Sequence, residues 1–430
     1  MWEAINNMAG GPAETMGSSA LSSGAEPVMR AIPRISIQAF CEAPETATIV
    51  QQAATDRRVA KTHFNLQMGG IPAAVTHFSD SPTPNLLIVE TRANAEQALA
   101  EIDQLAQVCD SGTKVMVIGH VNDILLFREL MDRGVSEYMV APIMPLQLID
   151  AIAKVYLDPD APVLGRSIAF VGAKGGVGSS TVAHNVSWII SEHMKRDLVL
   201  ADFDVPFGTV SLDFNQDPPQ GIAEALNAPE RIDETMLERL LTPCSEHLNL
   251  MAAPGTLDRD ADYESDAFEP MIDVIRQTTP MLTIDLPHLW TGWARRTLLS
   301  ADDVVITAAP DLANLRNARN LVEILKKNRL NDNEPLLVIN MVGMPKRPEI
   351  SIHDFKDALG IEPSLVIPFD PQTFGTAANN GQMIEELARQ SKPAEGFREL
   401  VHILTGQPEV SKKGRSILQP LISKFSKLKG

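Results

Sequence analysis

The sequence predicts an α/β protein built from two doubly wound parallel-sheet domains joined by a short linker. Between residues 35 and 157, short apolar runs alternate with amphipathic helical patterns, and the alternation repeats between residues 166 and 408. This order of elements is typical of a parallel sheet covered by helices on both faces. Residues 158–165 contain two prolines and no helical pattern, which predicts the linker between the domains.

The composition restricts the classes of partner that the chain can bind. Its 430 residues carry a formal net charge of −18, and 44% of them are hydrophobic, as in an ordinary globular protein. An acidic chain does not favour a broad surface for nucleic-acid phosphates, so we expect no nucleic-acid partner. Three widely spaced cysteines favour a reducing cytoplasm, and no secretory signal or membrane-spanning apolar run is evident.

The first predicted domain, residues 35–157, follows a segment of different composition. Residues 1–34 are rich in Gly, Ser, Ala, Met and Pro without periodicity, so we expect a flexible leader. The expected strands of the domain cover residues 35–40, 85–90, 114–119 and 137–140. The expected helices cover residues 45–55, 93–108, 124–133 and 146–156. This alternation predicts a sheet of the flavodoxin-like type.

The spacing of these elements resembles a two-component receiver domain, including the approach to the last strand at 134–138 and Ala141-Pro142 after it. A receiver has acidic residues after its first strand and accepts a phosphate on an aspartate after its third. It also has a hydroxyl residue after its fourth strand and a lysine after its fifth. The residues nearest to those places are Cys41, Glu42, Glu90, Gly119 and Ala141. A glutamate cannot form an aspartyl phosphate, and an alanine cannot form a salt bridge to one. We therefore expect a receiver-like domain without its switch, which serves as a docking or dimerising surface.

A glycine-rich turn follows the first buried strand of the second domain, residues 167–171. Closely spaced glycines let backbone N–H groups converge, and the helix that follows directs its positive end at an anion. Gly172 and Gly178 match the two glycines of G-x-x-x-x-G-K-[ST], and Ser180 matches its magnesium-binding hydroxyl. Ser179 stands where that motif has lysine. The predicted nucleotide-binding residues of the loop are Gly175, Gly176, Val177, Gly178, Ser179, Ser180 and Thr181.

Acidic residues follow two predicted strands of the same domain. Asp202 and Asp204 come after the strand at 197–201, and Asp285 comes after the strand at 281–284. Carboxyl ends of parallel strands meet at one edge of the sheet, so these side chains are expected to face a nucleotide crevice. A single aspartate at such a place often caps a helix, but acidic residues after two strands that follow a phosphate-binding loop favour a site.

The run KGGVG at 174–178 resembles the deviant Walker A loop of the ParA/MinD family of dimerising ATPases. The resemblance implies ATP and Mg²⁺ as cofactors and a homodimer in which Lys174 reaches the nucleotide of the partner subunit. It also implies that Asp285 is the Walker B residue that holds Mg²⁺ through water. Asp202 would support Mg²⁺ together with Ser180, and Asp204 would orient the attacking water. Lys174 and Asp204 are thus the candidate catalytic residues.

Two further residues are implied by the same resemblance. Asn340 ends the predicted strand at 336–341, where this family places a residue that hydrogen-bonds adenine. Pro368 belongs to the run VIPFD at 366–370, which we expect to follow the last strand and to pack against the base. Arg316 and Arg319, on the helix predicted at 314–325, form a solvated face or touch a partner subunit.

Replacement of the loop lysine by Ser179 affects the expected chemistry. Charge-assisted hydrogen bonds contribute roughly 1.5–3 kcal/mol, against about 1 kcal/mol for neutral ones. If that difference is lost from the transition state alone, hydrolysis slows roughly ten- to thirtyfold. If the ground state loses as much, affinity falls instead. We expect ATP to bind and to be hydrolysed slowly or not at all.

Residues 409–430 differ from the rest of the chain because their last twenty positions carry six Lys or Arg and no acid. The interleaved apolar residues are Ile417, Leu418, Leu421, Ile422, Phe425 and Leu428. Such a basic amphipathic tail can lie on an anionic membrane surface, and the alternative is a disordered tail kept soluble by its charge.

The combination of a degenerate receiver and a ParA/MinD-type domain with Lys174 kept resembles the CpaE/TadZ proteins of the Flp (Tad, type IVc) pilus. The likeness is strongest at 172–188, 202–214 and 285–306. It implies a scaffold that localises pilus assembly, recruits the secretion machinery and lies in the cytoplasm, peripheral at the inner membrane or a cell pole. The alternatives are a working MinD-like ATPase that cycles on the membrane and a DNA partition protein, which the acidic charge disfavours.

Overall fold

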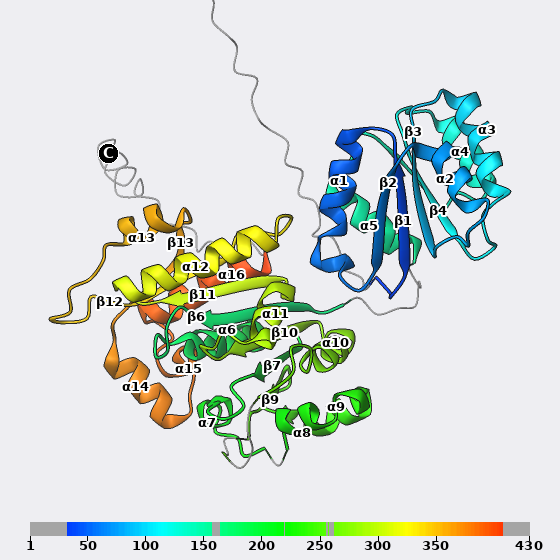
Figure 1. Ribbon diagram of the computed structural model, residues 1–430. Coiled ribbons are helices and arrows are strands. Elements are labelled where there is room, and N and C mark those ends of the chain that lie inside the picture. The colour runs from blue at the N-terminus through cyan, green and yellow to red at the C-terminus, as the bar shows by residue number, and fades with distance from the viewer. Residues whose placement is uncertain (1–31, 157–163, 219, 255–256, 258–261, 407–430) are drawn as a thin grey trace, which may run out of the picture.

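The computed structural model describes residues 32–406 except 157–163, 219, 255–256 and 258–261. Residues 1–31 of the predicted leader, the predicted tail and most of the predicted linker therefore lie outside the described residues. Ile32, which was expected to belong to the leader, is buried in the core of the first domain. Figure 1 shows two α/β domains, one before the linker and one after it. Within the described residues, no helix is both long and apolar enough to span a bilayer.

The first domain contains a five-stranded parallel sheet in the order β2-β1-β3-β4-β5. Its strands are β1 (Ser36–Cys41), β2 (His63–Met68), β3 (Leu86–Thr91), β4 (Lys114–Gly119) and β5 (Glu137–Val140). Its helices are α1 (Pro44–Ala54), α2 (Gly70–Phe78), α3 (Ala95–Ala106), α4 (Ile124–Asp132) and α5 (Pro145–Val155), with a 3₁₀ turn, η1 (Arg57–Val59). α1 and α5 pack on one face of the sheet, and α2, α3 and α4 pack on the other (Figure 1).

β2 and α2 were not among the elements expected from the sequence. β2 is an edge strand, and only its half-buried Phe64 and Leu66 pack against the core, so it carries no continuous apolar run. Strands with one solvated face give this weaker alternating pattern. The strand and the helix that follows complete the sheet without altering the predicted fold class, which is confirmed.

Glu90, at the place of the receiver's phosphate acceptor, is fully buried and has its carboxylate occupied by four donors. It accepts hydrogen bonds from the backbone N–H groups of Glu42 (2.7 Å) and Ala43 (2.9 Å) and from Thr46 Oγ1 (2.7 Å). His120 Nε2 lies 2.9 Å from its Oε1. Burial would raise the pKa of Glu90, but these hydrogen bonds outweigh burial and lower it. The ionised side chain therefore binds β3 to the start of α1.

Gly119, at the place of the receiver's hydroxyl residue, has no room for a side chain. A Cβ there would lie 2.2 Å from Tyr138 Oη, whose hydroxyl donates a hydrogen bond to the Val121 carbonyl at 2.6 Å. The ring of Tyr138 thus fills the space in which a receiver holds a threonine or serine. These packing contacts are those of a structural domain rather than of a phosphorylation site.

The second domain is organised around an eight-stranded sheet in the order β13-β12-β11-β6-β10-β7-β9-β8. Its strands are β6 (Arg166–Gly172), β7 (Leu198–Asp202), β8 (Thr242–Pro243), β9 (Leu248–Met251), β10 (Met281–Leu286), β11 (Asp303–Ala308), β12 (Leu336–Val342) and β13 (Pro363–Pro368). All pairs are parallel except β8 with β9, an edge pair too short to give a sequence pattern. β6 lies between β10 and β11, so connections leave it in both directions, which creates a crevice at its carboxyl end.

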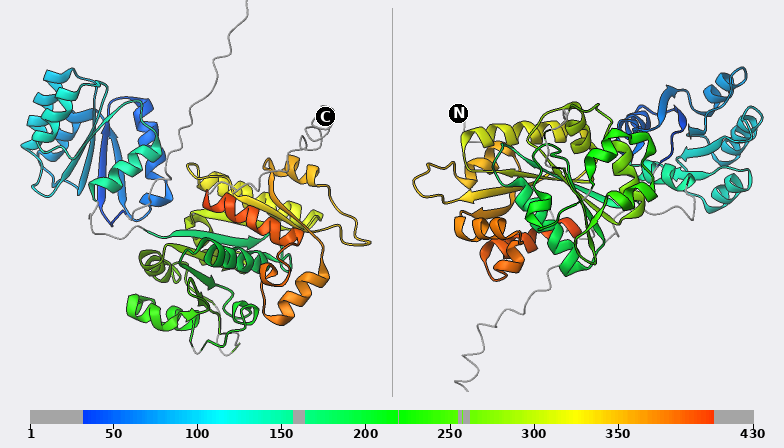
Figure 2. Two further views of the ribbon diagram at one scale, coloured as in Figure 1. Left: turned by 180° about the vertical axis from the view of Figure 1, so that it is seen from behind. Right: turned by 90° about the horizontal axis from the view of Figure 1, so that it is seen from below.

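Helices cover both faces of this sheet in both views of Figure 2. One face carries α8 (Ile222–Asn227), α9 (Glu234–Leu240), α10 (Glu269–Thr278), α11 (Gly292–Ser300), α12 (Leu312–Asn328) and α13 (Ile352–Leu359). The other carries α6 (Ser179–Met194), α14 (Pro371–Asn380), α15 (Ile384–Leu387) and α16 (Lys392–Thr405). A short α7 (Val210–Asp213) and a 3₁₀ turn, η2 (Pro229–Arg231), complete the domain. We expected residues 366–370 to follow the last strand. β13 in fact ends at Pro368, so Val366 to Pro368 lie within that strand.

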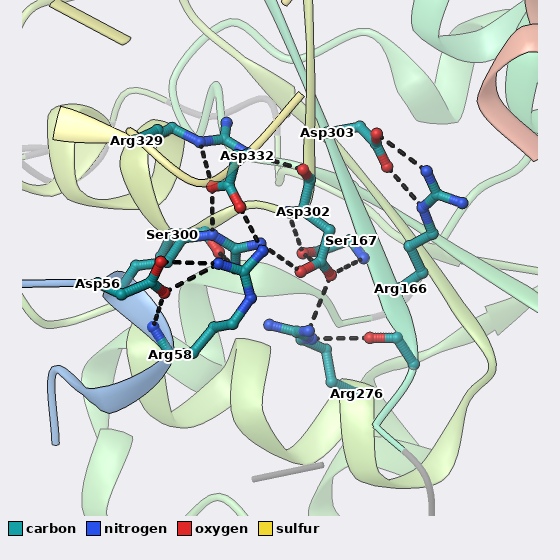
Figure 3. A network of polar contacts seen from close by, with 12 residues as sticks. Asp56, Arg58, Arg166, Ser167, Arg276, Ser300, Asp302, Asp303, Arg329 and Asp332 are labelled. Atoms are coloured by element: carbon teal, nitrogen blue, oxygen red, sulfur yellow. Dashed lines mark hydrogen bonds and ion pairs between the residues drawn. The ribbon is translucent and has the colours of Figure 1, made fainter. Parts of the chain in front are cut away.

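Arg57 of η1 connects the two domains through Asp302 and Asp332. Figure 3 shows these two carboxylates within a network of polar contacts. Its Nη2 lies 2.9 Å from Asp302 Oδ1, its Nε lies 2.8 Å from Asp332 Oδ2, and its Nη1 donates to the Ser300 carbonyl at 2.9 Å. Both carboxylates are almost fully buried. Asp302 also accepts from the backbone N–H of Ser167 at 2.8 Å, at the start of β6. The first domain is thereby fixed to the strand that carries the glycine-rich loop.

Other contacts extend the same interface. Arg58 pairs with Asp332 and Asp56, Lys61 pairs with Asp273, and Asn331 Nδ2 donates to Asp56 Oδ2 at 2.9 Å. η1 precedes β2, while Asp302 and Asp332 precede β11 and β12. The domains therefore meet through the amino edges of their sheets, and both carboxyl edges face away from the junction.

The replacement Arg57→Ala should separate the domains. The replacement removes one cation from each of two buried carboxylates, although Asp302 keeps Arg276 and Asp332 keeps Arg329. It therefore removes the ion pairs that Arg57 makes across the junction without leaving a buried charge unpaired. We expect a larger radius of gyration in small-angle X-ray scattering. Arg133→Ala is the control, because Arg133 makes only exposed pairs within the first domain and should leave the scattering unchanged. Identical scattering from Arg57→Ala would show that the ion pairs do not hold the domains together.

Candidate functional site

The glycine-rich loop joins the buried β6 to α6, which begins at Ser179. Gly176 (φ 77°) and Gly178 (φ 86°) adopt left-handed backbone conformations that other residues rarely take. Lys174 is exposed at the tip of the loop. The loop therefore has the strand–turn–helix context of a phosphate-binding loop, with its lysine free at the surface.

Asp202 and Asp285 lie side by side because β7 and β10 pair in parallel with these two residues in register. Asp202 is fully buried, and its carboxylate accepts from the backbone N–H groups of Asp204 (3.1 Å) and Val210 (3.2 Å). Burial, together with the neighbouring charge of Asp285, raises the pKa of Asp202 to about 7. Two buried carboxyl groups thus lie next to each other at the carboxyl ends of neighbouring strands.

Asp204 lies two residues beyond β7 and is half-buried. Its Oδ1 accepts from the Phe207 N–H at 3.2 Å, and burial raises its pKa. The three predicted aspartates are therefore gathered at the edge of the sheet from which the glycine-rich loop also projects. Their position at this edge is the one expected from the sequence, and their roles toward a nucleotide and Mg²⁺ stay predictions.

His184 belongs to this group, although it was not among the residues predicted from the sequence. It projects from α6 and is almost fully buried, with Nδ1 2.8 Å from Asp213 Oδ2 and Nε2 3.5 Å from Asp285 Oδ2. Burial alone would lower the pKa of His184, but the hydrogen bond to Asp213 and the Asp285 carboxylate raise it to about 10. An imidazolium thus balances part of the negative charge beneath the crevice. Its only trace in the sequence is a histidine within an apolar helical pattern.

The residues present can accommodate a nucleotide and a magnesium ion. Ser179 Oγ and Asp285 Oδ1 are buried and have no hydrogen-bond partner in the described part of the chain. Buried polar atoms are almost always satisfied in folded proteins, so these two atoms are available to bind a ligand at the crevice. No group of three His, Cys, Asp or Glu side chains among the described residues could hold a metal alone. Mg²⁺ is usually held by one or two carboxylates together with substrate phosphates, so the donor set suits a magnesium–nucleotide complex.

Asn340 and Pro368 are placed differently. Asn340 is buried in β12, where its Nδ2 donates to the Val177 carbonyl at 2.8 Å and its Oδ1 accepts from the Met341 N–H at 2.8 Å. Its amide therefore supports the glycine-rich loop, and adenine recognition stays a prediction. Pro368 pairs with Val342 at the end of the edge strand β13. That strand lies three positions from β6, roughly 14 Å away at the usual strand spacing.

Two further side chains contact the loop and were not expected. His288, in the segment after β10, has Nδ1 2.9 Å from the Gly172 carbonyl, and Asn317 of α12 donates from Nδ2 to the Ala173 carbonyl at 2.8 Å. Neither belongs to a local motif, so only the packing of α12 and of the segment after β10 against the loop could identify them.

The comparisons with known proteins agree with this geometry. A family described as "AAA domain" matches residues 165–338. The septum site-determining protein MinD of Synechocystis is 24% identical over 253 residues, 57% of this chain and 91% of its own length. A ParA family ATPase from Chlorobium tepidum aligns structurally with a TM-score of 0.50 at 22% identity, over 55% of this chain and 98% of that one. The second domain thus has the fold of a ParA/MinD-type P-loop NTPase.

A narrower relationship comes from sequence identity. The pilus assembly protein CpaE of Caulobacter crescentus, a solved structure, is 51% identical over 30% of this chain and 98% of that chain, with a TM-score of 0.30. Identity at this level over nearly the whole of the other chain establishes common descent. The chain belongs to the CpaE family of pilus assembly proteins. The family predicted from the sequence is confirmed.

Gly178→Ala should disrupt the site because a Cβ there would lie 2.6 Å from Asn340 Nδ2. Gly343→Ala is the matched control, since Gly343 has a similar φ of 82° but open space around its Cβ. Both variants should lose roughly 1 kcal/mol or more of stability from the left-handed conformation. Calorimetric ATP titration should show at least about a tenfold loss of affinity for Gly178→Ala only, the change that one lost interaction of about 1.4 kcal/mol produces. Equal ATP affinity in the two variants would contradict the assigned site.

Proposed function

We propose that the protein is an ATP-binding localisation and assembly scaffold of a Flp-type (type IVc) pilus secretion system. It acts as a nucleotide-linked dimer with weak or no ATP hydrolysis. The observation that carries this proposal is a glycine-rich strand–turn–helix loop beside buried aspartates. Ser179 stands at its lysine position, with a hydroxyl that has no hydrogen-bond partner among the described residues. Membership of the CpaE family supports the pilus system as the setting.

Different residues of the crevice would bind the phosphates and the Mg²⁺ ion. The backbone N–H groups of 175–178 and the hydroxyls of Ser179 and Thr181 would hold the phosphates. Ser180, Asp285 and Asp202 would hold Mg²⁺ together with the phosphate oxygens, and the ion would supply charge neutralisation at the phosphates. Deprotonation of Asp202, whose pKa is raised to about 7, completes that ligand set.

Slow hydrolysis follows from the distribution of charge around the crevice. Ser179 offers a neutral hydroxyl, and the cation of His184 is already engaged by Asp213 and Asp285. Asp204 is positioned to orient water, as the family resemblance implies. The loop therefore binds phosphate mainly through neutral donors, which stabilise a transition state less than a lysine does.

Dimerisation is supported by the surface around the loop. Phe207, Leu289, Trp290 and Leu312 follow β7, β10 and β11, and each is between 52% and 73% exposed. Apolar side chains gathered at one edge are typical of a surface that a partner covers. Lys174, exposed at the same edge, is free to reach a nucleotide in a second subunit.

Recruitment of pilus components is assigned to the first domain. Ile124, Leu125 and Met144 at the starts of α4 and α5 are exposed at the carboxyl edge of its sheet, away from the domain junction. That edge and the nucleotide edge can therefore be occupied by different partners at once. The basic tail, residues 409–430, would add attachment to the inner-membrane surface.

Replacing Ser179 of the loop by lysine tests whether the serine limits ATP hydrolysis. The parent protein should bind ATP with Mg²⁺ and hydrolyse it slowly, whereas Ser179→Lys should raise turnover by about tenfold or more because it restores a charge-assisted contact. Single-turnover assays with the purified protein measure both rates. Rapid turnover in the parent without any partner would exclude a scaffold with a weakened ATPase.

A MinD-like ATPase that cycles on and off the membrane is the alternative function, favoured by the intact Asp204 and Asp285. The same pair of proteins separates the two functions when liposome flotation is measured with ATP. A scaffold should float equally with serine or lysine at 179, whereas a cycling ATPase should leave the membrane faster with lysine.

Lys174→Ala should prevent ATP-dependent dimerisation without weakening ATP binding within one subunit, because the side chain projects from the loop. Analytical ultracentrifugation with ATP should show dimers for the parent and for Lys114→Ala, an exposed lysine of the first domain that serves as control. Lys174→Ala should remain monomeric. A dimer formed equally well by Lys174→Ala would remove the cross-subunit role of this lysine.

A further inference from the structure

Three side chains from separate elements donate hydrogen bonds to carbonyls of the glycine-rich loop from behind. His288 binds Gly172 O at 2.9 Å, Asn317 binds Ala173 O at 2.8 Å and Asn340 binds Val177 O at 2.8 Å. A carbonyl only accepts, so Nδ1 of His288 carries the proton in this contact. The three donors hold both ends of the loop and leave its tip, 174–176, free.

The amide groups of Asn317 and Asn340 are oriented by their other partners. Asn317 Oδ1 accepts from Arg316 at 3.0 Å and 3.2 Å, and Asn340 Oδ1 accepts from the Met341 N–H at 2.8 Å. Reversing either amide would place an oxygen against a carbonyl and a nitrogen against a donor. The NH₂ groups must therefore face the loop.

Peptide planarity transmits the contacts of Asn317 and Asn340 to the open side of the loop. The Ala173 N–H, which follows the Gly172 carbonyl, instead donates to the Thr307 carbonyl at 2.8 Å, so His288 anchors the start of the loop. In a trans peptide the C=O of one residue and the N–H of the next point in opposite directions. The bond from Asn317 to Ala173 O thus turns the Lys174 N–H toward the open side, and the bond from Asn340 to Val177 O does the same for Gly178. The N–H groups of 174, 175, 176 and 178 make no hydrogen bond to the part of the chain that the structure describes.

We propose that His288, Asn317 and Asn340 form a frame in which His288 anchors the start of the loop and the two asparagines preset its amides for phosphate. The cradle then exists before nucleotide binds and does not require a lysine at 179. The proposal rests on the proposed nucleotide site and identifies the residues that position it. Preorganisation lowers the entropy lost on binding, which is how neutral donors alone can hold a phosphate. The framing residues are positioning residues, since none is argued to touch the nucleotide.

Asn317→Asp tests the frame because it keeps the size and the acceptor oxygen but replaces the donor NH₂ by oxygen. Asn328→Asp is the matched control, since Asn328 lies on the same helix and donates to the Ile324 carbonyl at 2.8 Å, outside the loop. Hydrogen–deuterium exchange of 173–178 in the nucleotide-free full chain should be faster in Asn317→Asp alone. ATP affinity should fall by about tenfold, the change that corresponds to one neutral hydrogen bond, with melting temperatures matching the control.

His288→Ala is the second variant, and as His288 is exposed its replacement should not prevent folding. It should also accelerate exchange of the loop, while Asn317→Gln, which restores a donor, should recover part of the affinity. Unchanged exchange in both Asn317→Asp and His288→Ala would overturn the frame, whatever the affinity. If the parent bound no ATP, the proposed function would fail, yet the exchange of the nucleotide-free protein would still decide whether the frame orders the loop.

Discussion

The carboxylate of Asp302 is the contact on which the arrangement of the two domains depends. It accepts from the backbone N–H and the hydroxyl of Ser167, at the start of β6, and pairs with Arg276 and with Arg57 of the first domain. Burial would raise the pKa of Asp302, but the two guanidinium groups outweigh burial and lower it, so the group stays ionised. Removing either guanidinium group would destabilise the buried carboxylate. The contacts of Asp302 therefore fix the P-loop strand to the domain junction.

This junction gives the molecule two independent working edges. Parallel strands place their carboxyl ends together, and the contacts of Asp302 and Asp332 occupy the amino ends of β6, β11 and β12. The P-loop and its aspartates therefore remain open at the opposite edge, as does the carboxyl edge of the first domain. A scaffold that must hold a nucleotide-linked partner and a second protein at the same time needs this separation.

The distribution of charge is the reason for our proposal that the second domain combines the fold of an ATPase with weak or no hydrolysis. Asp202 and Asp285 bring negative charge to the crevice, and His184 offsets part of it from beneath. At the phosphate side, the loop contributes backbone N–H groups and serine hydroxyls in place of an ammonium group. Shape and neutral hydrogen bonds are sufficient for binding, whereas rapid phosphoryl transfer needs positive charge where the transition state develops it.

The fold class, the P-loop and the strand-end aspartates could be predicted from the sequence, because each depends on a local pattern of apolar periodicity, glycine spacing or the end of a buried strand. No local pattern predicted the strands β2, β8 and β9. β2 has a solvated face, and β8 and β9 are very short. The sequence could not predict the roles of His184, His288 and Asn317, because these roles depend on residues that are close in space and distant along the chain. Arg57 and Asp302 are 245 positions apart, and only the tertiary structure decided that they meet, since no local pattern encodes a contact at that separation.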